Sequence, residues 1–140
     1  MMARKSLVPI LFVGLGFLAY AQDKPQISRE PAQYTSPASG ADMFSTYCSV
    51  CHGPKGKGNG PAASALKKQP ADLTQLSKKN GNKYPEFKVA GFIKGDYVLA
   101  SHGSRDMPIW GQIFRQMDGD LLATARIRNL TEYVATLQDK

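Results

Sequence analysis

Two cysteines and a histidine stand together in the run Cys48-Ser49-Val50-Cys51-His52. If the run is helical, thiols three residues apart lie one turn apart on one face, and His52 lies on that face too. Thiols so placed can add to the two vinyl groups of a single haem, while the imidazole reaches the iron from the proximal side. The run therefore has the C-x-x-C-H spacing that is typical of c-type haem attachment.

Three other kinds of site use cysteines at this spacing. A thioredoxin-like dithiol enzyme needs a βαβ context, and the sequence pattern shows none. A zinc site needs four ligands, whereas the chain has two cysteines and only one further histidine, His102. A plain disulfide beside an incidental histidine leaves the helical setting and an export signal unexplained. We therefore predict one haem c attached to Cys48 and Cys51, with His52 as the proximal iron ligand.

The other face of the iron needs a ligand from elsewhere in the chain. Electron-transfer haems often pair histidine with methionine, which raises the potential. Met43 lies on the cysteine helix and cannot reach that face. Met107 precedes Pro108, which favours an extended conformation in a glycine-bearing loop. We predict Met107 as the distal ligand, with two alternatives left open: His102, and Met117 from a loop or helix start.

The N-terminal residues predict export. Arg4 and Lys5 precede an apolar stretch over residues 7–20, and Ala19 and Ala21 stand where signal peptidase requires small residues. The stretch is 14 residues long, shorter than the ~20 needed to span a membrane. We therefore predict cleavage after Ala21 and a periplasmic protein, the alternative being an uncleaved anchor. An oxidising compartment also predicts that the cysteine pair is bonded or covalently occupied.

Beyond the signal, the pattern predicts a flexible arm and one all-α domain. Residues 22–37 carry three prolines among polar residues and have no periodicity. The folded domain is expected over residues 38–140, without strand pairs. Loops are expected at 53–60 and 95–111. Helices are expected from Ser39 through the cysteines, at Pro61–Lys67, Asp72–Lys79 and Pro85–Lys94, and from Asp118 or Asp120 to the end.

Apolar residues at helical spacing mark the faces that we expect to be buried. Two segments carry the clearest signal, the one before the 95–111 loop and the closing one. Their predicted anchors are Phe87, Phe92 and Ile93 in the first, and Leu121, Ile127, Leu130, Tyr133, Val134 and Leu137 in the second.

The chain is basic, with 18 Lys+Arg against 11 Asp+Glu in 140 residues and a formal charge of +7. Without the signal the charge is +5, and the segment 55–94 holds nine lysines and two acids, a net +7. Such a segment can steer a protein to an acidic redox partner, or it can simply aid solubility. Nucleic-acid binding is the weakest interpretation, because no aromatic residues are interleaved with these lysines to stack on bases.

Taken together, these features resemble the class I c-type cytochromes, which are small single-haem electron carriers. The resemblance covers most of residues 38–140. It rests on Cys48 to Gly53, the glycine-rich loop ending in Gly60-Pro61, Met107-Pro108 with Trp110-Gly111, and the closing helix with Leu130, Tyr133 and Leu137.

The resemblance implies a small all-α cytochrome c fold wrapped around the haem, with His52/Met107 ligation. It implies that the carbonyl of Pro61 accepts the Nδ1–H of His52, which would orient the ring. It also implies a helix crossing in which Gly40, with Phe44 nearby, meets Tyr133.

The resemblance leaves two aromatic residues with alternative roles. Trp110 and Tyr84 lie near the haem or its propionates, or they are ordinary core aromatics.

The expected function is that of a periplasmic one-electron carrier rather than an enzyme, because two protein ligands leave no open position on the iron. Its partners would be an oxidase, reductase or dehydrogenase, with membrane contact only through these or an uncleaved signal. One alternative is a cytochrome subunit that relays electrons within a periplasmic dehydrogenase or oxidase. Another is a haem sensor or peroxidase-like protein, which requires an exchangeable iron ligand.

Overall fold

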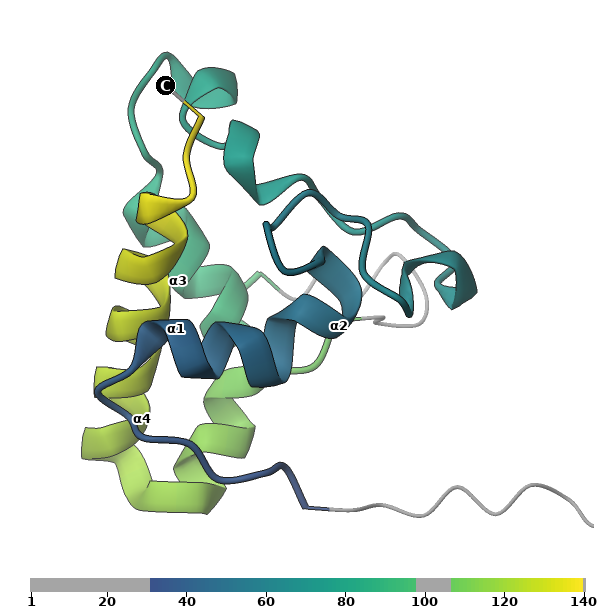
Figure 1. Cartoon of the computed structure of the whole chain (residues 1–140). Coiled ribbons are helices and arrows are strands. Elements are labelled where there is room, and N and C mark those ends of the chain that lie inside the picture. Colours follow the sequence, from purple (N-terminus) through teal and green to yellow (C-terminus); the bar gives the residue numbers. More distant parts are fainter. Residues whose placement is uncertain (1–30, 98–106, 140) are drawn as a thin grey trace, which may run out of the picture. The chain divides into compact units, whose positions relative to one another are not determined.

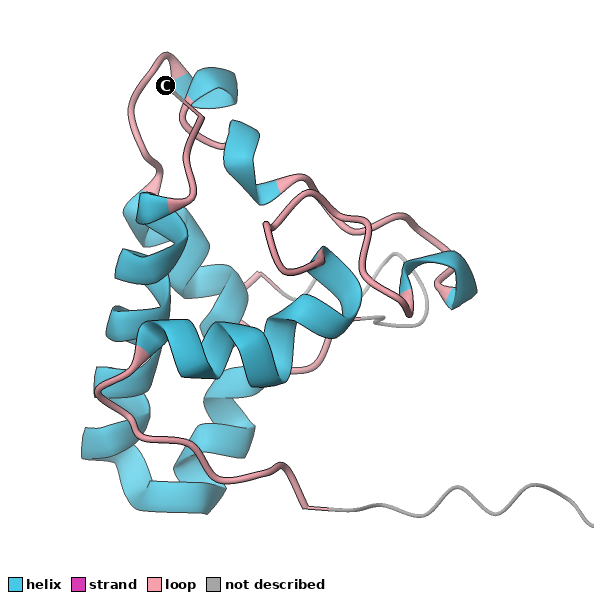
Figure 2. Ribbon diagram, in the orientation of Figure 1, coloured by secondary structure: helices cyan, strands magenta, loops and turns pink. Residues whose placement is uncertain are grey.

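Helices make up all the regular secondary structure in the part of the chain that the computed structural model describes, residues 31–97 and 107–139 (Figure 1). Figure 2 shows them joined by loops and turns. The described residues belong to one compact unit. The prediction of an all-α domain is confirmed.

Three consecutive helical segments carry the chain through the cysteines. Ser39 caps the first, because its Oγ accepts a hydrogen bond from the Asp42 amide at 3.1 Å. The last ends at Gly53, whose φ of +78° favours glycine. The middle segment is a π-turn, which sequence periodicity does not predict and which is frequent at functional sites. In chain order the three segments are α1 (Gly40–Met43), η1 (Phe44–Cys48) and α2 (Ser49–His52).

The chain between α2 and the next long helix is mostly loop. The predicted glycine-rich loop over 53–60 is confirmed. The helices predicted at 61–67 and 72–79 shrink to single 3₁₀ turns, because these stretches lack the repeated apolar residues that stabilise longer helices. The elements are η2 (Ala63–Ala65), η3 (Leu73–Gln75), η4 (Lys78–Asn80) and α3 (Glu86–Lys94), the last close to its predicted bounds.

The closing helix, α4 (Trp110–Thr136), begins earlier than predicted. It breaks at Gly119, where φ is +78° and ψ 177°. The helix after this break confirms the predicted start near Asp118 or Asp120. The helix before it corrects the prediction that Trp110 lies in a loop and that Met117 is a loop or helix-start residue. The Asp and Gly residues resemble the beginning of a helix, whereas here they mark a kink between two helical halves.

α1 and α4 cross at Gly40, and α3 packs on α4 (Figure 1). A Cβ atom at Gly40 would overlap the carbonyl oxygen of Asn129 and crowd the Cβ of Tyr133. The rings of Phe44 and Tyr133 lie 5.3 Å apart beside the crossing. The predicted crossing of a small residue with an aromatic residue is confirmed.

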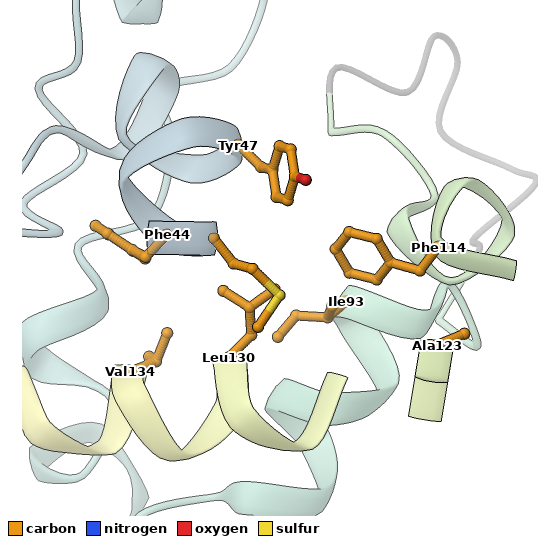
Figure 3. Packing of buried hydrophobic residues seen from close by; sticks show 8 residues of the cluster. Phe44, Tyr47, Ile93, Phe114, Ala123, Leu130 and Val134 are labelled. Carbon is orange, nitrogen blue, oxygen red and sulfur yellow. The ribbon is translucent and has the colours of Figure 1, made fainter. Parts of the chain in front are cut away.

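The core lies where these helices meet (Figure 3). Met43 is fully buried in it, which agrees with its exclusion as a ligand. The buried hydrophobic residues of the core are Met43, Phe44, Tyr47, Ile93, Phe114, Ala123, Leu130 and Val134.

Three predicted core residues are exposed instead. Phe87 is 90% exposed, Phe92 49% and Leu121 84%. On α3 the inward face is formed by Val89 and Ile93, which are one turn apart, so neither phenylalanine lies on it. The apolar pattern predicted helix α3 correctly, but it assigned more residues to the buried face than the structure buries.

Part of the predicted flexible arm is anchored to the domain. Residues 33–37, which we call the strap, form hydrogen bonds with Tyr47, Arg126 and Asn129. Thr35 is buried. The prediction of flexibility is wrong for the strap, because its polar backbone supplies partners that buried side chains of the domain require.

Several predictions concern residues outside those described. These are the secretory signal, its cleavage after Ala21, the first part of the arm and the alternative ligand His102. Within residues 31–97 and 107–139, no helix has the length and apolar character to cross a membrane.

Candidate haem site

The two thiols are presented by one short helical stretch. Cys48 ends the π-turn η1 and stands at the N-terminus of α2, and Cys51 lies one turn further on. Both side chains are half-buried, and no disulfide joins them. The structure therefore places both thiols, and His52 after them, on one continuous helical stretch.

The acidity of Cys48 distinguishes between the two chemistries that a C-x-x-C run supports. Burial, with a smaller contribution from the nearby Cys51, raises the pKa of Cys48 to about 12. Dithiol oxidoreductases instead lower the pKa of an attacking cysteine, so that it is a thiolate near neutral pH. The environment of Cys48 therefore lacks the feature that activates the attacking cysteine of a dithiol oxidoreductase.

His52 ends α2 with one ring nitrogen engaged. Its Nδ1 lies 3.0 Å from the carbonyl oxygen of Ala71. Burial lowers the pKa of His52, although the Ala71 bond partly opposes this shift. A neutral ring that donates its Nδ1–H to a carbonyl presents the lone pair of Nε2 to a metal, which is the usual arrangement of a histidine ligand.

The acceptor of this bond differs from the prediction, which named the carbonyl of Pro61. Gly60 donates its amide to the Cys51 carbonyl at 3.0 Å, and Ala62 donates to Val50 at 2.9 Å. These two bonds tie the backbone around Pro61 to the end of α2, and Pro61 itself is exposed. The later segment around Ala71 reaches the imidazole instead.

The C-terminus of the chain holds the segment that carries Ala71. The Leu73 amide donates to the Gly56 carbonyl at 2.7 Å. Gln138 donates its Nε2 to the Leu73 carbonyl at 2.7 Å and accepts from the Ser77 amide at 2.8 Å. The acceptor for His52 is therefore fixed by residues far away in sequence, and we did not predict any of these contacts.

Asp72 adds a local constraint beside the acceptor carbonyl. Its carboxylate accepts hydrogen bonds from the hydroxyl and the amide of Thr74, at 2.7 Å and 2.9 Å. The hydroxyl bond is the main reason that the pKa of Asp72 is lowered, and nearby lysines lower it further. The 3₁₀ turn η3 that follows is thus capped by a residue adjacent to Ala71.

Met107 is half-buried in the non-helical residues that lead into α4. Three residues later, Trp110 packs against Tyr47, with ring centroids 5.0 Å apart. Tyr47 directly precedes Cys48. The segment of the predicted distal ligand is therefore connected to the cysteine helix indirectly, through the rings of Trp110 and Tyr47. Met117, the alternative, is half-buried on the first half of α4.

Tyr84 and Trp110 have packing partners within the protein. The Tyr84 hydroxyl donates to the carbonyl of Thr131 at 2.8 Å, and burial raises the pKa of this tyrosine. Trp110 stacks on Phe114 at 5.7 Å. Both residues pack against the core, as the simpler of their two predicted roles requires.

The donor set fits a covalently attached haem. Two thiols one turn apart match two vinyl groups, and the half-buried imidazole of His52 has its Nδ1 held by a carbonyl and its Nε2 available as a ligand. A thioether on a separate segment completes a set that is typical of electron-transfer haems.

Comparison with known proteins agrees with this chemistry. Residues 35–134 match the family described as cytochrome c oxidase, cbb3-type, subunit III, and the chain belongs to this family. It is therefore a c-type cytochrome domain with covalently bound haem c, and the class I single-haem type fits at this level. No curated protein and no solved structure matches the chain.

Proposed function

We propose that this electron-transfer haem protein is a one-electron carrier of the periplasm, exported by its N-terminal signal and released after Ala21. Cys48 and Cys51 form the two thioethers, His52 is the proximal ligand and Met107 the distal one. The observation that carries the proposal is the fixed orientation of His52, whose Nδ1 bond to Ala71 leaves Nε2 to bind iron.

The residues of the chain perform binding and orientation rather than bond chemistry. When bound, haem iron supplies reversible one-electron exchange. Cys48 and Cys51 would anchor the haem to the helical stretch that carries them, and the Ala71 carbonyl holds the imidazole plane of His52. Met107 would fill the position that a substrate could otherwise take. With both iron ligands supplied by the chain, little of the protein would have to move on electron exchange.

Absorption spectra of the oxidised and reduced protein, produced with a haem-attachment system, test this function. We expect c-type haem bands, a thioether–iron band in the oxidised form, and no carbon monoxide binding to the ferrous protein at neutral pH. Ready binding of carbon monoxide would contradict stable Met107 ligation and favour a sensor or peroxidase-like protein instead.

A second function is favoured by the description of the family, which names a subunit of an oxidase. In that case the domain relays electrons inside a periplasmic oxidase or dehydrogenase complex rather than diffusing between partners. Purification at native expression levels distinguishes the two, because a relay subunit co-purifies with a catalytic subunit and a free carrier does not.

The lysines of segment 55–94 suggest the kind of partner. All nine are exposed, and Lys94 is the only one of the nine that has an ion-pair partner among the described residues, Asp96 at 3.3 Å. We propose that they guide the protein to an acidic docking surface on its redox partner. Solvent screening over a Debye length of ~8 Å at physiological salt makes such guidance sensitive to ionic strength.

The bimolecular electron-transfer rate with an acidic redox protein is therefore expected to fall steeply as salt is added. Lys78→Glu with Lys79→Glu should lower the rate at low salt and flatten its salt dependence. Arg128→Gln, a charge change outside the segment, is the control. A rate that rises with salt would contradict steering and leave the lysines a role in solubility only.

A further inference from the structure

Arg126 is a charged residue with a fully buried side chain, and the ligation proposed above makes no use of it. Its exposed fraction is 0%. Its Nε donates to the Asp118 carboxylate at 2.6 Å, and the nearly buried carboxylate also contacts Nη2. A buried ion pair is weak evidence for stability, since apolar side chains of similar volume often serve as well. The structural role of Arg126 therefore has to be found in its other hydrogen bonds, which go to residues 33–37.

The remaining donors of Arg126 hold the strap. Its Nη2 donates to the Thr35 carbonyl at 2.7 Å, and its Nη1 donates to the Thr35 hydroxyl at 3.1 Å. Asn129, further along α4, donates to the carbonyl of Pro37 at 2.7 Å. Arg126 and Thr35 are 91 residues apart in sequence, so α4 fastens the strap across the fold.

Hydrogen-bond directions in this cluster can be assigned. The Tyr47 hydroxyl donates its single proton to the Gln33 carbonyl at 2.6 Å. The Tyr47 and Thr35 hydroxyls lie 2.9 Å apart, so Thr35 is the donor of that bond. Thr35 in turn accepts from Arg126. A directed chain thus runs from Arg126 through Thr35 and Tyr47 to Gln33, buried as far as Tyr47 and part-buried at its last bond, and adjacent bonds in such a chain strengthen one another.

Tyr47 connects this chain to both ligand-bearing segments. It directly precedes Cys48. Its ring packs against Trp110 at 5.0 Å and Phe114 at 5.6 Å, on the first half of α4 (Figure 3 shows Tyr47 and Phe114). Trp110 follows Met107 by three residues. The position of one tyrosine ring therefore relates the cysteine helix to the segment of the distal ligand.

We propose that Arg126 is a positioning residue for haem ligation, which fixes Tyr47 through the strap and so holds the Cys48 turn in register with the Met107 segment. This inference rests on the proposed His52/Met107 ligation. Losing a link in the chain lets Tyr47 and Trp110 separate, and the Met107 thioether is then held less firmly.

A matched pair of substitutions at Thr35 tests the chain while leaving the Arg126–Asp118 pair in place. The readout is the pH at which the thioether–iron band of the oxidised holoprotein is half lost on raising the pH. Thr35→Val removes the central hydroxyl and is expected to lower this pH by about one unit, which corresponds to an about tenfold weaker Met107–iron bond equilibrium. Thr35→Ser keeps the hydroxyl and is expected to match the wild type.

Arg126→Gln should lower the pH of half-loss further than Thr35→Val, with unchanged covalent haem. Arg128→Gln is its control, because Arg128 lies two residues away and pairs with Glu132 at 2.7 Å on the surface. If Arg126→Gln fails to fold, the Thr35 pair decides. Equal values for wild type and Thr35→Val overturn this inference alone, whereas a wild type without the band overturns the ligation and the inference together.

Discussion

Replacing either Cys48 or Cys51 with serine is expected to reduce stably attached haem by at least about tenfold, because a hydroxyl does not form the thioether that C-x-x-C-H attachment requires. The structure adds a reason for both cysteines to matter. Cys48 caps the N-terminus of α2 and Cys51 lies one turn further on, so each thiol would bond to a different vinyl group of the same haem. The measurement is haem that stays with the polypeptide after denaturation and extraction, for each variant produced with a haem-attachment system.

Val50→Ala is the matched control for these substitutions. Val50 lies inside the same motif and is 45% exposed, so its truncation leaves both thiols and the core in place. We expect haem attachment in this variant to equal that of the wild type. Wild-type haem yield in both serine variants would contradict the assignment of the motif.

Met107→Ala is expected to keep covalent haem and to abolish the thioether–iron band. Because the methyl group of alanine cannot ligate iron, the distal position becomes available, and the ferrous protein should bind carbon monoxide. Loss of a thioether ligand should also lower the reduction potential, since His/Met ligation raises it. Absorption spectra, carbon monoxide titration and potentiometry of the purified holoprotein measure the three effects.

Met117→Leu serves as the control and also tests the alternative ligand. Met117 is half-buried on a regular part of α4, where leucine conserves volume and apolar character. We expect its spectrum to match that of the wild type. A band that survives Met107→Ala and disappears in Met117→Leu would assign the distal position to Met117.

The chemistry of the site follows from local sequence. Cys48, Cys51 and His52 fall within one helical turn, so their spacing alone places them together once the segment is helical. The crossing at Gly40 was predicted from the resemblance to the class I c-type cytochromes, in which a small residue of the first helix meets an aromatic residue of the last. These features depend on residues that are close in sequence or on a packing pattern shared by a family.

The elements could be predicted to different extents. α3 and the second half of α4 carry clear apolar periodicity and were predicted, although Phe87 and Leu121 proved exposed. The first half of α4 was not predicted, because Gly119 and its acidic neighbours resemble a helix start rather than a kink. The π-turn η1 was missed as well, since it has no periodicity of its own.

The sequence by itself determined the attachment motif and the all-α class, and its resemblance to the class I c-type cytochromes added the helix crossing. Only the tertiary structure decided that Ala71 rather than Pro61 accepts the His52 proton, and that the strap is bound rather than flexible. The partners in these bonds are 19 and 91 residues apart. A buried polar group needs a hydrogen-bond partner, and that partner can come from a segment far away in sequence. The local sequence pattern does not show which segment the fold places beside it.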